Sequence, residues 1–176
     1  MWRYYYTITR NIFILPGIIK KMQDMIRYSK EHPDKYDEEK NYKYVQSIVD
    51  IMEKTGHVKT EVFGYENLPK KGGYMMYPNH QGKYDAYSII SVHKQPCTVV
   101  MDIKKSNFIF IKQILDTLKG KRLDKENNRQ AMVIINEIAK EVEAGRRYIL
   151  FPEGKYDNNK KNSLIEFKSG CFKIYW

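Results

Sequence analysis

The feature that most constrains the fold is an alternation of short apolar runs with longer amphipathic segments, which begins after Gly56. The short runs are rich in β-branched, aromatic and Met residues and are typical of strands. These predicted strands are 58–63, 74–77, 97–101 and 147–151. The intervening segments carry apolar residues at helical spacing, and the predicted helices are 86–93, 108–118 and 128–144. This alternation predicts an α/β fold with a largely parallel sheet flanked by helices.

Glycines mark the expected ends of the helical segments. Gly145 follows the clearest helix, and Gly120 follows the one before it. Gly56 follows a further helical pattern over 44–54. Glycine is the commonest residue just beyond a helix, so each of these positions predicts a helix end.

The N-terminal region has a different composition. Residues 2–19 combine Trp, Tyr, Ile and Phe with Arg3 and Arg10, and two lysines follow at once. Aromatic rings with basic flanks are typical of an interfacial helix, although a terminal helix packed on its own domain would also fit. Residues 29–43 are polar and predict an exposed linker or a helix–helix turn. We therefore expect residues 1–55 to form an N-terminal helical membrane-associating segment and residues 56–176 an α/β domain.

The location of the chain is expected to be the cytoplasmic face of a membrane, with peripheral or monotopic attachment. No uncharged stretch approaches the roughly 20 residues that a spanning helix needs, and no secretory signal is evident. No CxxC pair is present, so a zinc site is unsupported. Cys97 opens an apolar run, which predicts a packing role and a reducing environment.

The formal net charge of +10 favours anionic partners. Nucleic acid, an acidic membrane face and phosphorylated substrates all satisfy this condition, as does a solvated basic surface. Nucleic acid is disfavoured because the aromatic residues concentrate in the N-terminal segment and the predicted strands instead of alternating with Lys and Arg in a recognisable RNA-binding motif.

The first candidate for chemistry is His80, which is followed five positions later by Asp85. A carboxylate that accepts the proton of one ring nitrogen fixes the tautomer and stabilises the imidazolium. Residues five apart do not share a helix face, so we expect His80 on a loop and Asp85 in the first turn of the next helix. Pro78 ends the preceding strand, and Gly82 gives the backbone freedom for this turn.

The same spacing occurs a second time, from His32 to Asp37. That segment lies in the charged linker, with no apolar strand before it. We interpret His32 as exposed and inert. His80 differs because it follows a predicted buried strand of a parallel sheet, where active sites usually form.

The second candidate is the end of the strand predicted over 147–151, where Pro152, Glu153, Gly154 and Lys155 follow. Proline ends the strand pairing, glycine allows close backbone approach to a ligand, and the two charged residues stand at the strand end. An ordinary strand and turn is the alternative interpretation.

Taken together, the two segments are more specific. An Asn-His-x4-Asp block ending at Asp85 and a later Phe-Pro-Glu-Gly block ending at Gly154 resemble the signatures of the glycerolipid acyltransferases, the 1-acyl-sn-glycerol-3-phosphate and lysophospholipid acyltransferase family. The lead-in at 63–69 and the glycine pair at 72–73 are also similar to this family. The resemblance covers residues 58–172.

The resemblance implies transfer of a fatty acyl group from acyl-coenzyme A or acyl carrier protein to the hydroxyl of lysophosphatidic acid or a related lysolipid. It implies His80 as general base and Asp85 as its orienter. An alkanol barely ionises at neutral pH, so its proton must leave as the new bond forms. The resemblance implies no cofactor and no metal, because the acyl donor is a substrate and neither cysteine need react.

The resemblance also implies acceptor-binding residues. Glu153 and Gly154 match the acceptor-binding block, and Lys155 follows where the family usually has Thr. Lys125 falls at the position of an arginine that holds the acceptor phosphate. Lysine supplies charge without the planar fork of arginine. Arg122 and Arg129, close in sequence, complete the predicted substrate-binding set.

The family usually continues beyond the region matched here, through another helix and strand. We therefore expect this chain, which stops at Trp176, to be truncated at its C-terminal end. The rival to an active enzyme is a catalytically defunct basic module that binds membranes or, less favoured, nucleic acid.

Overall fold

The computed structural model describes residues 6–7, 9–154, 163–167 and 169–172 of the chain. Its helices are α2 (Leu15–Glu31), α3 (Glu38–Gly56), α4 (Asp85–Val92), α5 (Ile109–Thr117) and α6 (Asn128–Glu143). Its strands are β1 (Tyr74–Met76), β2 (Thr98–Asp102), β3 (Lys121–Leu123) and β4 (Arg147–Ile149). Short 3₁₀ turns occur at Pro33–Lys35, Tyr65–Asn67, Lys105–Asn107 and Ser169–Phe172.

The strands form a four-stranded sheet in the order β1-β4-β2-β3. Every neighbouring pair is parallel. The predicted α/β fold with a parallel sheet flanked by helices is therefore confirmed. Because parallel strands point in the same direction, their C-terminal ends lie together at one edge of the sheet.

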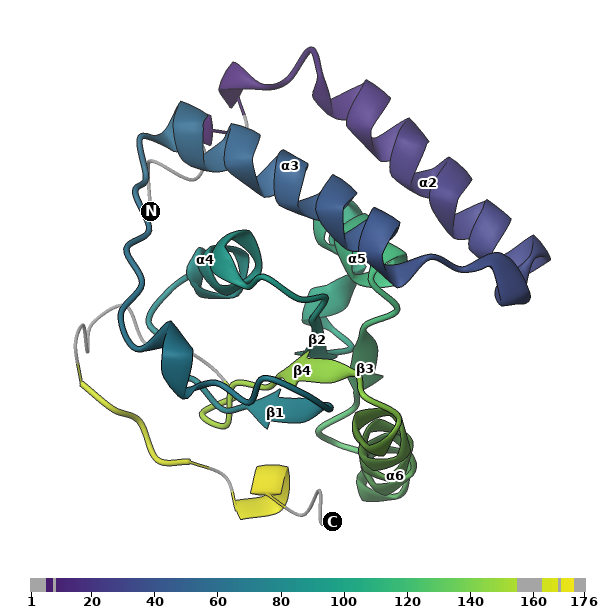
Figure 1. Cartoon of the computed structure of the whole chain (residues 1–176), viewed down its shortest axis with the longest axis vertical. Helices are drawn as coiled ribbons and strands as arrows, with labels where there is room; N and C mark the ends of the chain where they lie inside the picture. Colours follow the sequence, from purple (N-terminus) through teal and green to yellow (C-terminus); the bar gives the residue numbers. More distant parts are fainter. Residues whose placement is uncertain (1–5, 8, 155–162, 168, 173–176) are drawn as a thin grey trace.

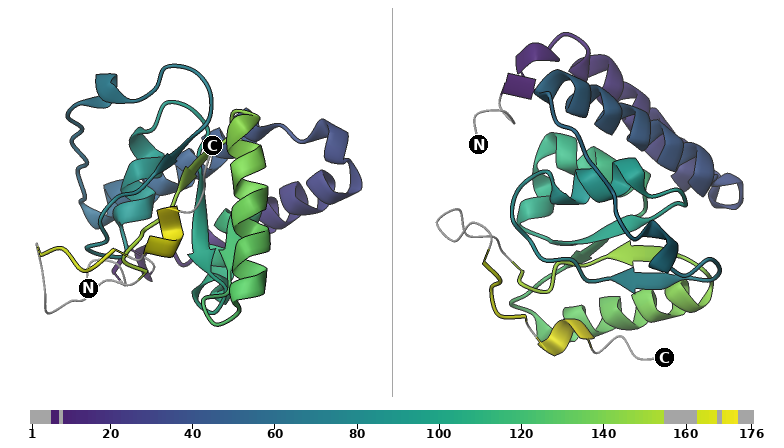
Figure 2. Two further views of the ribbon diagram at one scale, coloured as in Figure 1. Left: turned by 90° about the horizontal axis from the view of Figure 1, so that it is seen from below. Right: turned by 60° about the vertical axis from the view of Figure 1, so that its left-hand side comes forward.

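The connections between strands place helices on both faces of the sheet (Figures 1 and 2). Helices α4 and α5 lie on one face, and α6 lies on the other. Parallel crossovers are right-handed, and the chain moves outward from β1 to β2 to β3 and then back to β4. The reversal of direction puts α6 on the opposite face. There Ile138 and Val142 pack against Val100 and Tyr148 of the sheet.

Helices α2 and α3 form a hairpin that covers α4 and α5 on the side away from the sheet (Figure 1). Their buried side chains belong to the same hydrophobic core as residues of α4, α5 and the sheet. This core includes Met22, Val45, Ile48, Val49, Met52, Ile90, Ile114 and Ile149. Ile18 and Ile19 are partly buried against it. Residues 15–19 of the N-terminal segment thus pack on the domain itself.

The structure corrects the predicted N-terminal helices. A single helix over 2–19 is wrong, because residues 11–14 form a turn and α2 starts at Leu15, with Pro16 in its first turn. Proline suits this position because its missing N–H has no partner there. Residues 1–5 and 8 of that predicted helix lie outside the described residues. Within the described part of the chain, no helix combines the length and apolar character needed to cross a bilayer.

The predicted linker over 29–43 is too long. Helix α3 begins at Glu38, because the Asp37 carboxylate caps it by accepting the Lys40 N–H at 2.9 Å. Only residues 32–37 separate the two helices. The expected helix–helix turn is present, but it is short.

Two strand predictions differ from the structure. Residues 58–63 form no strand, because their alternating side chains have no neighbouring strand to pair with. Strand β3 was missed, because Lys121 and Arg122 make its sequence look like a loop. It pairs with β2 through Val100 and Lys121.

The ends of helices α3, α5 and α6 were predicted at Gly56, Gly120 and Gly145, and the structure differs from this in detail. Gly145 has a φ of 101° just beyond α6, as expected for a helix end. At the other two predicted ends, non-glycine residues take the left-handed conformation, namely His57 after α3 and Lys119 after α5. All three helix ends are therefore near the predicted glycines, but only Gly145 itself takes the left-handed conformation.

Candidate active site

The C-terminal edge of the sheet brings together four segments that lie far apart in the sequence. Strand β1 leads to His80, and β4 leads to Glu153 and Gly154. Strand β2 ends at Asp102, and β3 leads to Lys125. Ligand sites of parallel α/β proteins form at this edge, beyond the carboxyl ends of the strands. It is therefore the first place to look for a site.

His80 lies on the loop after β1, and Asp85 is the first residue of α4. This placement matches the expectation from the spacing of the two residues. The ring Nδ1 of His80 donates to Asp85 Oδ2 at 2.8 Å, since a carboxylate can only accept. The proton-accepting role of the ring then falls to Nε2. The side chains of His80 and Asp85 are 19% and 25% exposed, so the pair lies in contact with solvent.

The loop after His80 is shaped around the Asp85 carboxylate. The backbone N–H groups of Gln81 and Gly82 donate to Asp85 Oδ2 at 2.6 and 2.8 Å. Gly82 contributes its N–H here, and its backbone is not left-handed, so the conformational freedom predicted for it is not needed. Three donors therefore converge on one carboxylate oxygen and fix its position relative to the imidazole.

These contacts set the charge state of Asp85. Burial alone would raise the pKa of this carboxyl group, but the hydrogen bonds from His80, Gly82 and Gln81 outweigh it. The pKa of Asp85 is consequently held below its ordinary value. An ionised partner is the form that orients a histidine base and stabilises its protonated state.

Residues after β4 hold His80 from the other side. The His80 ring stacks on the Phe151 ring, with the centroids 4.2 Å apart and an angle of 26° between the planes. Glu153 is only 1% exposed, and its Oε1 accepts the backbone N–H of His80 at 2.8 Å. Gly154 has a φ of 66°, a conformation that glycine adopts without strain. The second sequence motif thus positions the first.

The predicted acceptor-binding residues have different surroundings. Lys125 Nζ contacts Asp102 Oδ2 at 2.9 Å and donates to the Gly154 carbonyl oxygen at 2.7 Å, so it lies at the site. Arg122 is turned toward α5, where it pairs with Asp116 at 2.6 Å. Arg129 is exposed on α6. Lys155 lies outside the described residues.

The remaining histidines have other surroundings. His93 is buried, and its Nδ1 and Nε2 are 2.6 Å from the Gln95 carbonyl oxygen and 2.7 Å from the Tyr74 hydroxyl. Burial lowers the pKa of His93, which keeps the ring neutral. His32 follows α2 and lies against the Tyr28 ring. His57 ends α3.

Cys97 is buried beside the Tyr42 hydroxyl, and burial raises the pKa of its thiol to about 12. This agrees with the predicted packing role, because the nucleophilic thiolate form is suppressed at neutral pH. Among the residues that the structure describes, no cluster of three or more His, Cys, Asp or Glu side chains is arranged to hold a metal ion.

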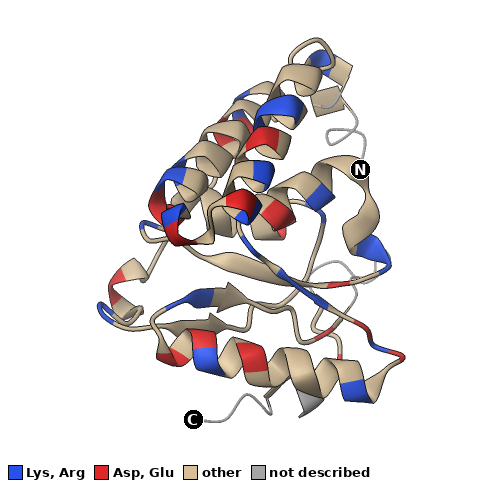
Figure 3. Cartoon of the chain, turned by 90° about the vertical axis from the view of Figure 1, so that its right-hand side faces the viewer, with Lys and Arg blue, Asp and Glu red and all other residues tan. Residues whose placement is uncertain are grey.

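Charged side chains outside the site are mixed in sign. Figure 3 shows Lys and Arg interspersed with Asp and Glu along α6 and along the α2–α3 hairpin on the face in view. A nucleic-acid-binding groove is typically lined by a continuous basic stripe. On the face in view, the Lys and Arg residues do not form such a stripe.

Fold and site together describe an α/β protein with a carboxylate-oriented histidine at the C-terminal edge of a parallel sheet. The sequence model of the family described as Acyltransferase matches residues 59–175. This match covers more than half of the chain, which therefore belongs to the acyltransferase family. The membership in the glycerolipid acyltransferases predicted from the two motifs is confirmed.

A relative supports the same class. A Caenorhabditis elegans protein named "Putative 1-acyl-sn-glycerol-3-phosphate acyltransferase acl-2" is 29% identical over 118 residues. The aligned part covers 66% of this chain and 41% of that protein, so this chain spans less than half of the relative's length. No solved structure matches the chain.

Sequence reasoning missed two residues at this edge. Asp102 was not considered, although an acid directly after a predicted apolar strand is a signal that could have identified it. Phe151 was included in the predicted strand and in the Phe-Pro-Glu-Gly block, but no role was predicted for its ring, which stacks on the His80 imidazole. Neither contact follows from local sequence, because both depend on which strands are neighbours.

Proposed function

We propose that this chain transfers a fatty acyl group from acyl-coenzyme A or acyl carrier protein to the hydroxyl of lysophosphatidic acid or a related lysolipid, as a step of phospholipid biosynthesis. The observation that carries this proposal is the 2.8 Å hydrogen bond between His80 Nδ1 and Asp85 Oδ2 at the C-terminal edge of the sheet. Membership in the acyltransferase family supports acyl transfer as the reaction class.

In the proposed reaction, His80 Nε2 takes the proton of the acceptor hydroxyl as its oxygen attacks the thioester carbonyl carbon. The new C–O bond forms, the C–S bond breaks, and the His80 imidazolium gives its proton to the departing sulfur, so the donor leaves as a thiol and the neutral base is restored. Asp85 keeps Nδ1 protonated and stabilises the imidazolium that forms. No acyl-enzyme and no cofactor take part, because the acyl donor already carries the activated group.

Glu153 and Lys125 support the reaction from the strand ends. The Glu153 carboxylate accepts the backbone N–H of His80, and this hydrogen bond positions the loop that carries the imidazole relative to the sheet. Lys125, on the loop after β3, donates to the Gly154 carbonyl oxygen and so places a positive charge at this edge of the sheet. We propose that an anionic headgroup binds on this side, with Arg129 and Lys155 as the further predicted contacts and Arg122 as a support of β3.

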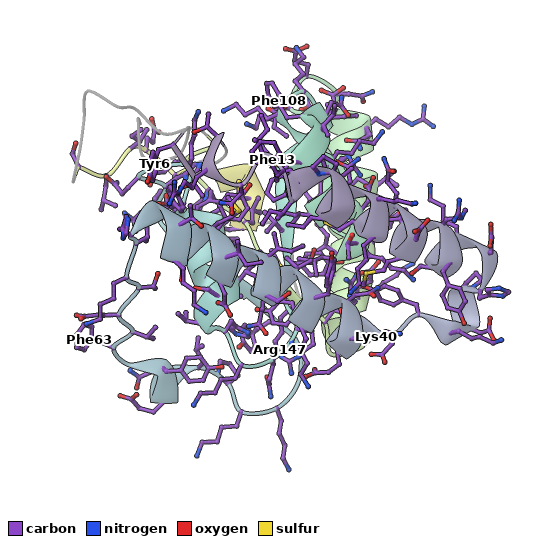
Figure 4. The ribbon with its side chains drawn as sticks, turned by 90° about the horizontal axis from the view of Figure 1, so that it is seen from above. Tyr6, Phe13, Lys40, Phe63, Phe108 and Arg147 are labelled. Carbon is purple, nitrogen blue, oxygen red and sulfur yellow. The ribbon has the colours of Figure 1, made fainter. Side chains whose placement is uncertain are left out.

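We further propose that the chain works at the cytoplasmic face of an anionic membrane. The supporting feature is an apolar rim, defined as the exposed residues Ile12, Phe13, Ile14, Phe108 and Ile109. Phe13 and Phe108 are 94% and 67% exposed, and Figure 4 labels both. Exposed aromatic and aliphatic side chains with nearby cations are typical of interfacial binding.

The rim lies at the same end of the molecule as the candidate site. Helix α5 begins soon after β2 ends, and α2 packs against α5. The two helices run in the same direction, because the Tyr36 hydroxyl just beyond α2 donates to the Thr117 carbonyl oxygen at the end of α5. Their N-terminal ends, with the rim, therefore point toward the catalytic edge.

The test of the reaction is acyl transfer by the purified chain, with lysophosphatidic acid in mixed micelles and either acyl-coenzyme A or acyl carrier protein as donor. A general base contributes on the order of 10²- to 10⁴-fold, so His80→Ala should lose activity by this factor. The matched control is His32→Ala, which should retain the wild-type rate. Equal rates for wild type and His80→Ala would eliminate His80 as the base. Binding of lipid vesicles without any turnover would favour the defunct module instead.

The membrane proposal has its own measurement, sedimentation with anionic phospholipid vesicles. Phe13→Ser and Phe108→Ser should each weaken binding. Phe63→Ser is the matched control, because Phe63 is 87% exposed but is not part of the rim. A loss in Phe63→Ser as large as in the rim variants would contradict a specific docking edge.

A further inference from the structure

Lys125 is held by two groups on neighbouring strand ends. Its ammonium contacts Asp102 Oδ2 at 2.9 Å and donates to the Gly154 carbonyl oxygen at 2.7 Å. Asp102 Oδ1 accepts the Lys104 N–H at 2.9 Å, which fixes the carboxylate at the end of β2. A lysine ammonium has three N–H donors, so two of them are already used by the protein.

The carboxylate beside Lys125 changes what the site can attract. A phosphomonoester such as the headgroup of lysophosphatidic acid carries close to two negative charges at neutral pH. Asp102 offsets the charge of Lys125 and also repels such a headgroup. Hydrogen bonds from Lys125 and from backbone N–H groups hold the pKa of Asp102 below its ordinary value despite its partial burial, so the carboxylate is ionised.

Another of the predicted acceptor-binding cations is also engaged. Arg122 pairs with Asp116 at 2.6 Å, and its Nε donates to the Ser106 hydroxyl at 3.1 Å. It cannot turn toward the site without giving up both contacts. The Asp102–Lys125 ion pair therefore affects how strongly this edge of the sheet attracts a doubly charged headgroup.

We propose that Asp102 is a specificity-determining residue, which lowers the preference of the site for phosphomonoester acceptors relative to lysolipids with a less negative headgroup. This inference rests on the proposed acyl transfer to a lysolipid at the same site. It goes further by assigning the acceptor preference to the Asp102–Lys125 ion pair.

The test compares wild type with Asp102→Asn on two acceptors, lysophosphatidic acid and lysophosphatidylcholine. Asparagine keeps the oxygen that accepts the Lys104 N–H but removes the charge. A partly exposed ion pair contributes up to about 1 kcal/mol, so the ratio of kcat/KM for lysophosphatidic acid over lysophosphatidylcholine should rise about 3- to 5-fold.

Two further variants separate a specific effect from a general one. Glu126→Gln removes one negative charge from an exposed pair with Lys104, one residue away from Lys125, and should leave the ratio within about twofold. Adding Lys125→Gln to Asp102→Asn should abolish the gain, because the liberated ammonium causes it. If Asp102→Asn lowers kcat/KM for both acceptors by the same factor, the proposal is overturned. An equal rise of the kcat/KM ratio in Glu126→Gln would also overturn it.

The same question can be answered without turnover. The affinity for each lysolipid in detergent micelles can be measured by titration of wild type and Asp102→Asn. Asp102→Asn should bind lysophosphatidic acid more tightly than wild type does and should bind lysophosphatidylcholine with unchanged affinity. If wild type transfers no acyl group to either acceptor, the proposed reaction fails, while this binding difference still supports or overturns the role of Asp102. An unchanged affinity for lysophosphatidic acid would overturn it.

Discussion

His32 and His80 are each followed five positions later by an aspartate, but the two segments fold in opposite ways. Asp85 points back toward the loop and accepts the His80 ring and the N–H groups of Gln81 and Gly82. Asp37 points forward and caps α3 through the Lys40 N–H. No hydrogen bond or ion pair joins the side chains of His32 and Asp37, both of which the structure describes.

The residue after each histidine explains much of the difference. Gln81 donates its N–H to the carboxylate, whereas Pro33 has no N–H to donate and begins a 3₁₀ turn. The surroundings differ as well, since His80 follows a strand of the sheet and His32 follows a surface helix. A motif with the right spacing becomes a site only where backbone donors and a neighbouring strand hold it.

The largest expected contrast is in the aspartates. Asp85→Asn should lower kcat on the order of 10²- to 10³-fold, because an amide in this place no longer fixes the tautomer or stabilises the imidazolium. Asp37→Asn should leave kcat unchanged within about twofold, since asparagine also caps helices. Steady-state acyl-transfer rates measure both. Similar losses in the two variants would contradict the assignment of catalysis to the His80 segment and not to the His32 segment.

A second substitution makes the His80 segment resemble the His32 segment. Gln81→Pro removes one N–H bond to the Asp85 carboxylate, and a hydrogen bond to a charged group contributes about 1.5–3 kcal/mol. We therefore expect activity to fall about 10- to 100-fold. The reciprocal Pro33→Gln should not alter the rate. Full activity in Gln81→Pro, with the fold intact by circular dichroism, would contradict the role of this N–H.

A smaller effect should appear in stability. Asp37→Ala removes the cap of α3 and should lower the free energy of unfolding by about 1 kcal/mol. Chemical denaturation followed by circular dichroism measures this change, and acyl-transfer activity at low temperature should stay at the wild-type level. Loss of activity without loss of stability would mean that Asp37 acts on the site.

The smallest expected effect is the pH dependence of the Asp85 contribution to stability. The folded-state pKa of Asp85 is lowered, so its stabilising contacts are fully present above the unfolded-state pKa of about 3.9 and are lost as the pH falls through the folded-state value. The difference in unfolding free energy between wild type and Asp85→Asn should therefore shrink below about pH 4. A difference that stays constant from pH 7 to pH 3 would argue against these contacts.

The sequence predicted well where a signal was local. The parallel α/β class, the position of His80 on a loop and the start of α4 at Asp85 all followed from short patterns of apolar residues and breakers. The strand over 58–63 was wrong because alternation cannot supply a pairing partner. Strand β3 was missed because two of its three residues are charged.

Contacts between strand ends could not be predicted from sequence. Strand β4 lies between β1 and β2, and this order brings Glu153 beneath His80. It also places β3 beside β2, so that Lys125 reaches Asp102. Local patterns give the direction of each strand but not its neighbours, so the assembly of the site needed the three-dimensional arrangement.

The most direct test of the paired action of His80 and Asp85 is a double-mutant cycle on acyl-transfer rates. It compares His80→Ala, Asp85→Ala and the combined variant with wild type. If Asp85 acts only through the imidazole, the combined variant should lose no more activity than His80→Ala alone, within about threefold, because residues that act as one unit are not additive. Losses that multiply in the combined variant would show that the two side chains act independently.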